Sequence, residues 1–226
     1  MSGMPDLGPV FLSVQLAAIT TVILLAIGAP LAWWLAVTRS RLRPIVEAVT
    51  ALPLVLPPTV IGFYLLLLMN PGAPLGGFWV GMSGGTLSFS FAGLVIASVI
   101  YSLPFMVQPL QAAFEAVGRG PMEAAASLRA SRLDAFLNVM LPQSGRGILT
   151  ACVLTFAHTI GEFGVVLMVG GNIPERTRTV SIAIYEHVES LDYAEAHMLS
   201  AGLLIFSFVV LVAVYALNRR VRVRVF

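Results

Sequence analysis

The sequence predicts an all-α polytopic membrane protein with five transmembrane helices in a single domain, residues 1–226. Hydrophobic residues make up 58% of the chain and charged residues 11%, well below the roughly one-quarter that soluble domains carry. No charged residue occurs from Ala48 to Phe114, which is long enough for two membrane crossings of about 20 residues each. The apolar runs are continuous, whereas barrel strands alternate polar and apolar residues, so helices are favoured.

Charges and helix-breaking residues divide the chain into five apolar segments. Residues 70–85 are rich in turn residues and are expected to form a hairpin loop between the second and third segments. The first segment is too long for a signal-peptide core and has no basic residue before it, so we expect it to stay as a helix. The expected spans are about residues 10–37, 48–69, 91–114, 148–169 and 198–217.

The arginines indicate an orientation. If the chain crosses the membrane five times, every arginine except Arg176 and Arg178 falls on one side. The positive-inside rule makes that side cytoplasmic, with the N-terminus outside and the C-terminus in the cytoplasm. Their grouping at the ends of apolar runs argues against a nucleic-acid partner despite the net charge of +2. The cytoplasmic set is Arg39, Arg41, Arg43, Arg119, Arg129, Arg132, Arg146, Arg219, Arg220, Arg222 and Arg224.

The chain contains no lysine, which excludes a P-loop, because that motif uses a lysine to reach the nucleotide phosphates. Any ATP hydrolysis must therefore take place on a partner chain, and we expect neither a cofactor nor enzyme activity here. Cys152 is the single cysteine and lies in an apolar run, so no intrachain disulfide is possible and the redox compartment stays undetermined.

The longest expected cytoplasmic loop, residues 115–146, contains the polar stretch EAAASLRASRLDAFLNVMLP, Glu123–Pro142. A Gly-Pro pair and a run of helix formers predict a short helix that ends near Ala130. Ser131 then has the spacing of a capping box with Asp134. A second, amphipathic helix should lead back to the membrane, with its apolar side formed by Leu133, Phe136, Leu137, Met140 and Leu141.

Taken alone, two such helices are compatible with a plain solvated loop. Their residue order, however, resembles the EAA motif of ABC importer permeases: Glu-Ala-Ala, three residues, a usual glycine, and later a hydrophobic residue before Leu-Pro. In that family this coupling helix docks on the ATPase and transmits its closure to the spans. The family glycine is Arg129 here, which leaves the bend of the loop open but offers a salt bridge to an acidic ATPase surface. The resemblance implies coupling roles for Glu123, Ala124, Ala125, Leu128 and Arg129, while Val139, Leu141 and Pro142 fit the end of the motif.

Two further stretches, LPLVLPPTVIGFYLL from Leu52 and HTIGEFGVVLMVGGNIPERTRTVSIAIY from His158, narrow the choice. Together with the polar loop they resemble the molybdate permeases of bacterial ABC importers over nearly the whole chain. Sulfate and thiosulfate permeases share the GEFG element, and tungstate is a third possible cargo. The resemblance implies a type I importer permease fold in the bacterial inner membrane. It also implies a homodimer, two ATPase subunits that hold ATP and Mg, and a periplasmic oxyanion-binding protein.

Pro57 and Pro58, with Pro53 one turn earlier, are candidates for the translocation pathway. Each removes a helix hydrogen bond, and the freed carbonyls are tolerated at membrane depth only against protein or a water-filled cavity. The alternative is a simple packing kink. Three prolines within six residues favour the pathway.

Glu162, between Gly161 and Phe163, lies within the fourth apolar segment. An ionisable group at such depth is costly and marks a function or a buried pair. We interpret these three residues as a gate, unless Glu162 lies shallow near the outer headgroups. His158 is better explained as a satisfied packing histidine. No arginine lies within a span, so tight cargo selectivity should reside in the binding protein.

Arg176 and Arg178, in the expected outer loop with Glu175, could contact the binding protein or form a solvated surface pair. The apolar residues at 180, 184 and 188 predict a short interfacial or re-entrant helix after them.

Two other classes of function compete with the importer. A proton-coupled secondary transporter would use Glu162 and His158, and internal repeats would favour it, but we see none. A scaffold protein without transport activity would use the polar loop as a generic docking site. Purification with or without a nucleotide-hydrolysing partner separates the three.

Overall fold

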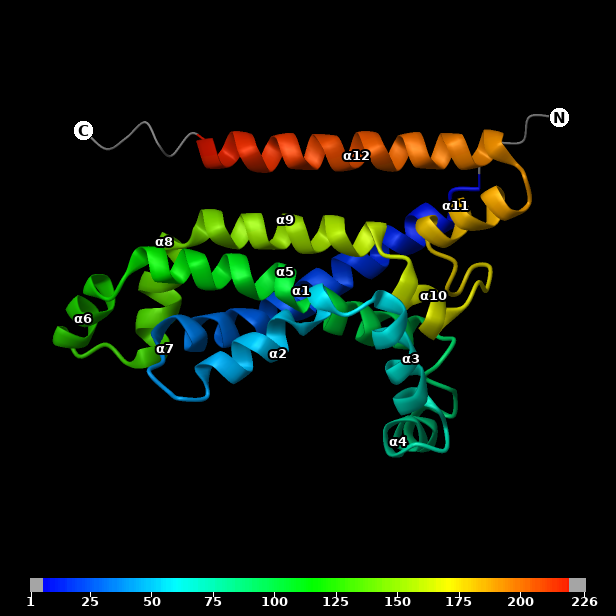
Figure 1. Cartoon of the computed structure of the whole chain (residues 1–226). Helices are drawn as coiled ribbons and strands as arrows, with labels where there is room; N and C mark the ends of the chain where they lie inside the picture. The colour runs from blue at the N-terminus through cyan, green and yellow to red at the C-terminus, as the bar shows by residue number, and fades with distance from the viewer. Residues whose placement is uncertain (1–5, 220–226) are drawn as a thin grey trace.

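The computed structural model describes residues 6–219, in which every regular element is helical, confirming the all-α prediction. Figure 1 shows an elongated molecule with α6, α7 and α8 at one end, the α6 end, and α3, α4, α10 and α11 at the other, the α11 end. In chain order the elements are α1 (Gly8–Val37), α2 (Arg43–Val55), α3 (Pro58–Met69), α4 (Pro74–Ser83), α5 (Phe91–Val117), α6 (Gly120–Ser127), α7 (Arg132–Ala135), the π-helix η1 (Phe136–Met140), α8 (Leu141–Gln143), α9 (Gly145–Gly161), α10 (Gly164–Gly170), α11 (Val180–Glu189) and α12 (Tyr193–Arg219).

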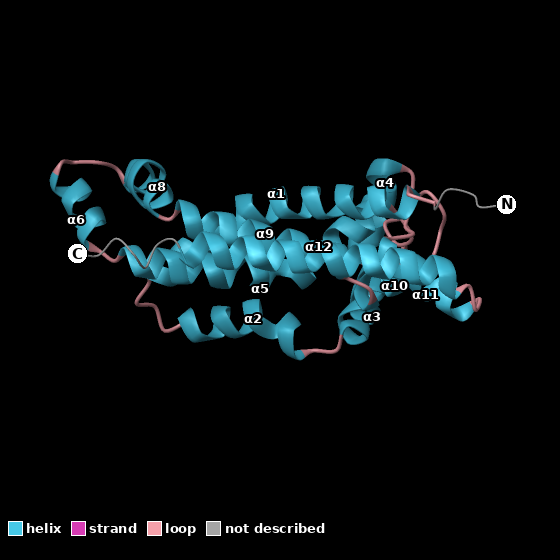
Figure 2. Ribbon diagram, turned by 90° about the horizontal axis from the view of Figure 1, so that it is seen from above, coloured by secondary structure: helices cyan, strands magenta, loops and turns pink. Residues whose placement is uncertain are grey.

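The centre of the molecule is a bundle of α1, α5 and α9. Figure 2 shows these helices lying along the length of the molecule. Small residues let these helices approach closely, as is usual where helices pack within a membrane. A Cβ added to Gly28 of α1 would lie 3.0 Å from Met106 Cγ of α5, and one added to Gly147 of α9 would overlap Ala113. The bundle therefore depends on glycine at these contacts.

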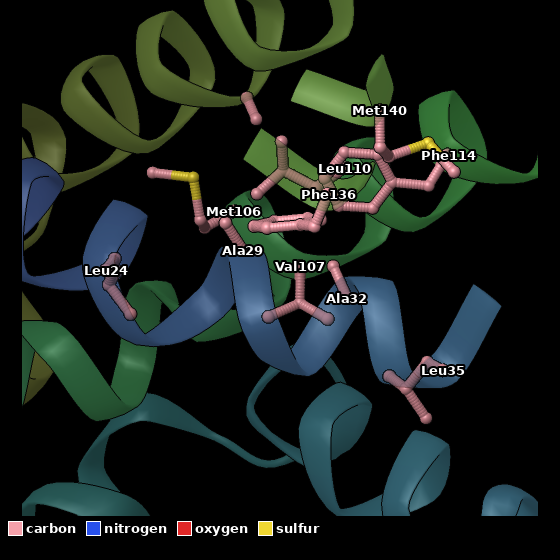
Figure 3. Close-up of a cluster of buried hydrophobic side chains, with 11 residues drawn as sticks. Leu24, Ala29, Ala32, Leu35, Met106, Val107, Leu110, Phe114, Phe136 and Met140 are labelled. Atoms are coloured by element: carbon pink, nitrogen blue, oxygen red, sulfur yellow. The ribbon is translucent and has the colours of Figure 1, made fainter. Parts of the chain in front are cut away.

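At the α6 end, the bundle shares a hydrophobic core with η1 (Figure 3). The Phe136 ring stacks on Trp33 of α1, with centroids 4.6 Å apart, and meets the edge of Phe114 of α5 at 5.9 Å. This core fixes the second half of the polar loop against the spans. Its buried members are Leu24, Ala29, Ala32, Leu35, Met106, Val107, Leu110, Phe114, Phe136, Met140 and Ala151.

Two of the expected spans are broken rather than continuous. Residues 48–69 fall on α2 and α3, which meet at an angle of 109°, and residues 148–169 fall on α9 and α10, which meet at 60°. The break after α2 is explained by Pro57 and Pro58, which cannot donate backbone hydrogen bonds. Within residues 6–219, α1, α5 and α12 are long and apolar enough to cross a membrane alone; five crossings result if each bent pair forms one.

The prediction of a plain hairpin loop at residues 70–85 is wrong, because α4 lies within it. Turn residues mark both ends of α4, although Gly76, Gly77 and Gly81 lie within it. Asn70 accepts a hydrogen bond from the Gly72 N–H through Oδ1 at 2.8 Å, and Pro74 opens the helix. Gly84 closes it with a φ of 71°, a value that favours glycine. The residues between these ends are free to be helical.

The chain finishes with α11 and α12. Helix α11 confirms the short helix predicted over 180–188, and α12 contains the fifth expected span with five extra residues before it. Much of α12 is exposed and apolar, including Leu204, Ile205 and Phe208. The arginines expected at 220, 222 and 224 lie outside the described residues.

Candidate functional site

The two breaks in the helices touch each other at the α11 end. A Cβ added to Gly164, the first residue of α10, would lie 2.7 Å from Pro58 Cβ, the first residue of α3. One turn further, a Cβ on Gly62 would lie 2.6 Å from Met168 Cβ. Helices α3 and α10 can therefore pack backbone against backbone because both glycines lack side chains. We call the segment Gly161–Gly164, together with Pro57 and Pro58, the joint.

Glu162 is the most unusual residue of the joint. Its backbone is extended, with φ −68° and ψ 135°, between the end of α9 and the start of α10. Its side chain is 4% exposed, and neither carboxylate oxygen has a hydrogen-bond partner among the described residues. Its carbonyl accepts a hydrogen bond from the Ser181 hydroxyl of α11. Glu162 is thus buried within the chain, while its role in a gate and its depth in the membrane stay predictions.

The other predicted gate residues differ in exposure. Gly161 and Pro57 are exposed, and Pro58 is half-buried against Gly164. The Phe163 ring is half-buried and packs on Tyr185 of α11, with centroids 5.1 Å apart. Residues that are distant in sequence thus meet at the joint, and α11 supports it from the side.

Helix α5 adds polar residues that the sequence analysis missed. Ser98 is fully buried near Glu162, and its hydroxyl also lacks a hydrogen-bond partner among the described residues. One turn along, the Ser102 hydroxyl lies 2.9 Å from His158 Nδ1 and 3.0 Å from Thr159 Oγ1. The His158 ring also stacks on Phe105, with centroids 3.7 Å apart, as expected for a packing histidine. Spacing by four residues along α5 was the signal that could have revealed the two serines.

The joint has no arginine or lysine nearby in the sequence. Arginine is absent between Arg43 and Arg119 and again between Arg146 and Arg176, and the chain has no lysine. A site that holds a dianion tightly normally offers a cation or several directed donors. The joint therefore has the composition of a passage or a gate rather than of a tight oxyanion site.

The second candidate site, the polar loop, lies at the opposite end of the molecule. Helix α6 ends at Ser127 instead of near Ala130. A helix that docks on another protein should leave its alanines without packing partners in the single chain. This holds for Ala124, which is exposed, but not for Ala125, which is 8% exposed. The loop folds back so that α6 packs on α7 and η1, which accounts for the burial of Ala125. Glu123 and Leu128 are exposed, Leu128 to 84%.

The backbone at Arg129 shows how the loop bends at the position where the family has a glycine. Its φ is 65°, in the left-handed region that glycine adopts most readily. Its N–H donates to the Ala126 carbonyl, and the N–H of Ala130 donates to the Ala125 carbonyl. The chain therefore makes the bend that a glycine would favour, with an exposed arginine in its place.

The second half of the loop matches the prediction in part. The Ser131 hydroxyl accepts from the Asp134 N–H at 3.1 Å, as a capping residue does. Phe136 and Met140 are buried, but Leu133 and Leu137 are exposed, so the predicted apolar side is wrong at these two positions. The π-helical turn of η1 shifts the side-chain register from the i, i+3, i+4 spacing used for the prediction. With Leu128, these leucines leave apolar side chains exposed at the α6 end.

At the α11 end, Arg178 is already engaged within the chain. It donates to Asn172 Oδ1 at 2.8 Å and pairs with Glu186 at 3.2 Å, instead of pairing with Glu175. Arg176 is exposed. Of the two arginines, Arg176 is thus the better placed to contact another protein.

Residues 28–223 match the family described as "Binding-protein-dependent transport system inner membrane component". The chain belongs to this family. It is 58% identical over 214 residues to the molybdenum transport system permease protein of Azotobacter vinelandii, with 95% of each chain covered. It is 30% identical over 193 residues to the sulfate transport system permease protein of Salmonella typhimurium, covering 85% of this chain and 69% of that one.

A solved structure shows the same fold. The inward-facing MetNI methionine ABC transporter aligns with a TM-score of 0.70 at 17% identity, covering 95% of this chain and 93% of the other. These comparisons confirm the resemblance drawn from the EAA and GEFG stretches, and identify the chain as a membrane component of a transport system. In this permease the structure brings Pro58 to the GEFG element and places the EAA residues at the far end of the bundle.

Proposed function

We propose that this chain is the permease subunit of an ATP-driven importer for molybdate and forms its translocation pathway. The observation that carries the proposal is the 58% identity to a molybdenum permease over 95% of both chains. Sulfate is the competing cargo, because the Salmonella relative matches over most of this chain at lower identity. Tungstate, a tetrahedral dianion like molybdate, is the second competitor.

The joint is the proposed gate, with Pro57, Pro58, Gly161, Glu162 and Phe163 along the pathway. Interrupted helices are tolerated at membrane depth only where protein or water satisfies the free backbone groups. Because no arginine lies in the segments around the joint, the cargo should pass without tight binding. Selectivity then resides in a periplasmic oxyanion-binding protein. The exposure of Arg176 supports a contact with that protein.

The proposed topology has five crossings, with α2 plus α3 and α9 plus α10 each forming one broken span. The α6 end is cytoplasmic and the N-terminus is outside, because all arginines except Arg176 and Arg178 then lie inside. Two copies of an ATPase supply the ATP and Mg sites. Each docks on the exposed α6 residues of one permease copy. The contact residues are Glu123, Ala124, Leu128 and Arg129, with Ala125 holding α6 against the rest of the loop.

A homodimer completes the pathway in this proposal. The centre of the single chain is filled by packed side chains, so a passage has to form between copies around a twofold axis. Helix α3 exposes Phe63, Tyr64, Leu67 and Leu68, which supports an apolar surface for the second copy there. The exposed apolar residues of α12 are suited to lipid.

Reconstitution tests the function. The chain is purified with its ATPase, placed in proteoliposomes with the oxyanion-binding protein, and assayed for uptake of radiolabelled molybdate. We expect uptake that requires ATP and is competed more strongly by molybdate and tungstate than by sulfate. ATP-dependent uptake of sulfate with no competition by molybdate would overturn the cargo, and uptake driven by a proton gradient without ATP would overturn the class.

A further inference from the structure

A cluster of four polar side chains joins α2 to α5 at the α6 end of the molecule. Arg43, the first residue of α2, donates through Nε to Glu47 Oε1 at 2.8 Å and through Nη2 to Glu115 Oε1 of α5 at 2.7 Å. The Gln111 amide of α5 donates to Glu47 at 2.8 Å and to Glu115 at 3.2 Å. We call these four residues the α2–α5 polar cluster. It holds one cation between two carboxylates.

Within the described chain α2 buries little apolar surface, although its Val46 is half-buried and packs against the core at the α6 end. Its buried residues are Thr50 and Pro53, and the Thr50 hydroxyl donates to Val46 of its own helix. The apolar residues Ile45, Val49, Leu52, Leu54 and Val55 are exposed. A cavity of about 220 Å³ separates α2 from α5 and α1 beside the cluster, lined by Leu35, Thr50, Ala51 and Val107 with Glu47 and Gln111. Figure 2 shows α2 along the edge of the bundle, beside α5.

The cluster also lies between the two candidate sites. Glu115 is two residues before the end of α5, and Gly118, with a φ of 75°, separates that end from α6. At its other end α2 stops at Val55, and Pro57 and Pro58 follow at the joint. A rigid connection between α2 and α5 would therefore link the helix proposed to dock on the ATPase with the break proposed to gate the pathway.

We propose that the α2–α5 polar cluster makes α2 move with α5, so that a displacement of α6 by the ATPase reaches the Pro57–Pro58 break. This inference rests on the proposed function of the chain. Partly exposed ion pairs are individually weak. Here Arg43 bridges both carboxylates through two nitrogens of its planar guanidinium, and α2 has little apolar burial that could replace them.

A role in helix stability alone makes a different prediction from a role in transmission. Loss of stability would lower ATPase activity and uptake together, because fewer folded complexes would remain. Loss of transmission leaves basal ATP hydrolysis unchanged, because the folded complex remains, but lowers the uptake per ATP. Spatial position between two sites is not proof of coupling, so the test restores the pair as well as breaking it.

The experiment compares wild type, Arg43→Glu, and the exchange Arg43→Glu with Glu115→Arg in proteoliposomes. The exchange again places one arginine beside two carboxylates. We expect uptake per ATP to fall about fivefold in the single variant, equivalent to about 1 kcal/mol, and to return to within about twofold in the exchange. Arg41→Glu is the matched control, because Arg41 is exposed and forms no ion pair with a described residue; its ratio should not change.

A second measurement does not depend on the cargo. Spin labels on exposed Ala48 and Ala112, in a Cys152→Ser background, report the separation of α2 and α5 in the ATPase complex. We expect one narrow distance distribution in wild type and the exchange, and a broad one in Arg43→Glu. If wild type takes up no molybdate but the distances behave as stated, the proposed cargo fails and the cluster stands. Narrow distances in Arg43→Glu, an unchanged uptake per ATP, or no recovery in the exchange would overturn the inference.

Discussion

The joint and the α6 loop are both breaks in otherwise regular helices, yet they are held in opposite ways. At the joint, Glu162 is 4% exposed and Gly164 presses against Pro58 of another helix. In the loop, Leu128 is 84% exposed and Arg129 adopts a left-handed backbone conformation. The joint is shaped by packing between distant segments, whereas the loop is shaped by local turns and core contacts behind it. Tertiary packing thus determines the proposed gate, and exposure suits the proposed docking helix to a separate protein.

The largest effect should follow from adding a single methyl group at the joint. Gly164→Ala places a Cβ 2.7 Å from Pro58 Cβ, so α3 and α10 must move apart. Overpacking of this kind costs about 1–3 kcal/mol. Thermal unfolding in detergent should show a lower midpoint for this variant. Gly202→Ala on α12 is the control, because a Cβ there meets no atom within 4 Å and alanine favours helices. Equal midpoints for the two variants would show that the joint is not tightly packed.

At the loop, Glu123→Lys should leave the folded chain intact but weaken its complex with the ATPase. The side chain is exposed, so the stability of the chain alone should change by no more than about 0.5 kcal/mol. Reversing a charge in the contact should reduce ATPase affinity about tenfold and uncouple hydrolysis from uptake. Binding measured in detergent tests this, with Glu175→Lys at the opposite end as the matched charge reversal. Normal affinity, uptake and stimulated hydrolysis in Glu123→Lys would exclude docking at α6.

Glu162→Gln tests whether the buried acid at the joint affects transport. The amide keeps the shape of the side chain but removes an acid from a pathway proposed to pass anions. We expect the uptake rate to change severalfold, on the scale of about 1 kcal/mol, while the molybdate-to-sulfate preference stays with the binding protein. Competition assays with the same binding protein measure both quantities. A changed preference at an unchanged rate would show that the membrane path itself discriminates.

The smallest effect is expected for Arg129→Gly. Glycine removes the steric cost of a φ of 65°, about 1–2 kcal/mol, but adds freedom to the unfolded chain, leaving a net gain of about 0.5 kcal/mol. Slower amide hydrogen exchange at residues 128–130 would report the gain. Arg132→Gly, at the first position of α7, should instead weaken the loop. Faster exchange in Arg129→Gly would show that the arginine side chain, rather than the backbone, stabilises the bend.

Sequence reasoning succeeded where the signal was local. Long apolar runs predicted α1, α5 and α12, and the spacing of Ser131 and Asp134 predicted the cap of α7. It failed where the structure depends on contacts between distant segments. The 60° bend at Glu162 and the 109° bend before Pro58 were each hidden inside one apolar run, although the prolines pointed to the second. Burial of Ala125 and the pairing of Arg43 with Glu115 also depend on residues that are not neighbours in the sequence.

Hydrogen–deuterium exchange on the permease, with and without its ATPase, tests the central contrast most directly. With no nucleotide present, so that the ATPase binds without closing, we expect the amides of α6 and residues 128–130 to become protected when the ATPase binds. Those of residues 161–164 should keep the same exchange in both samples, because their contacts lie within the chain. Protection at the joint with no change in α6 would contradict this account.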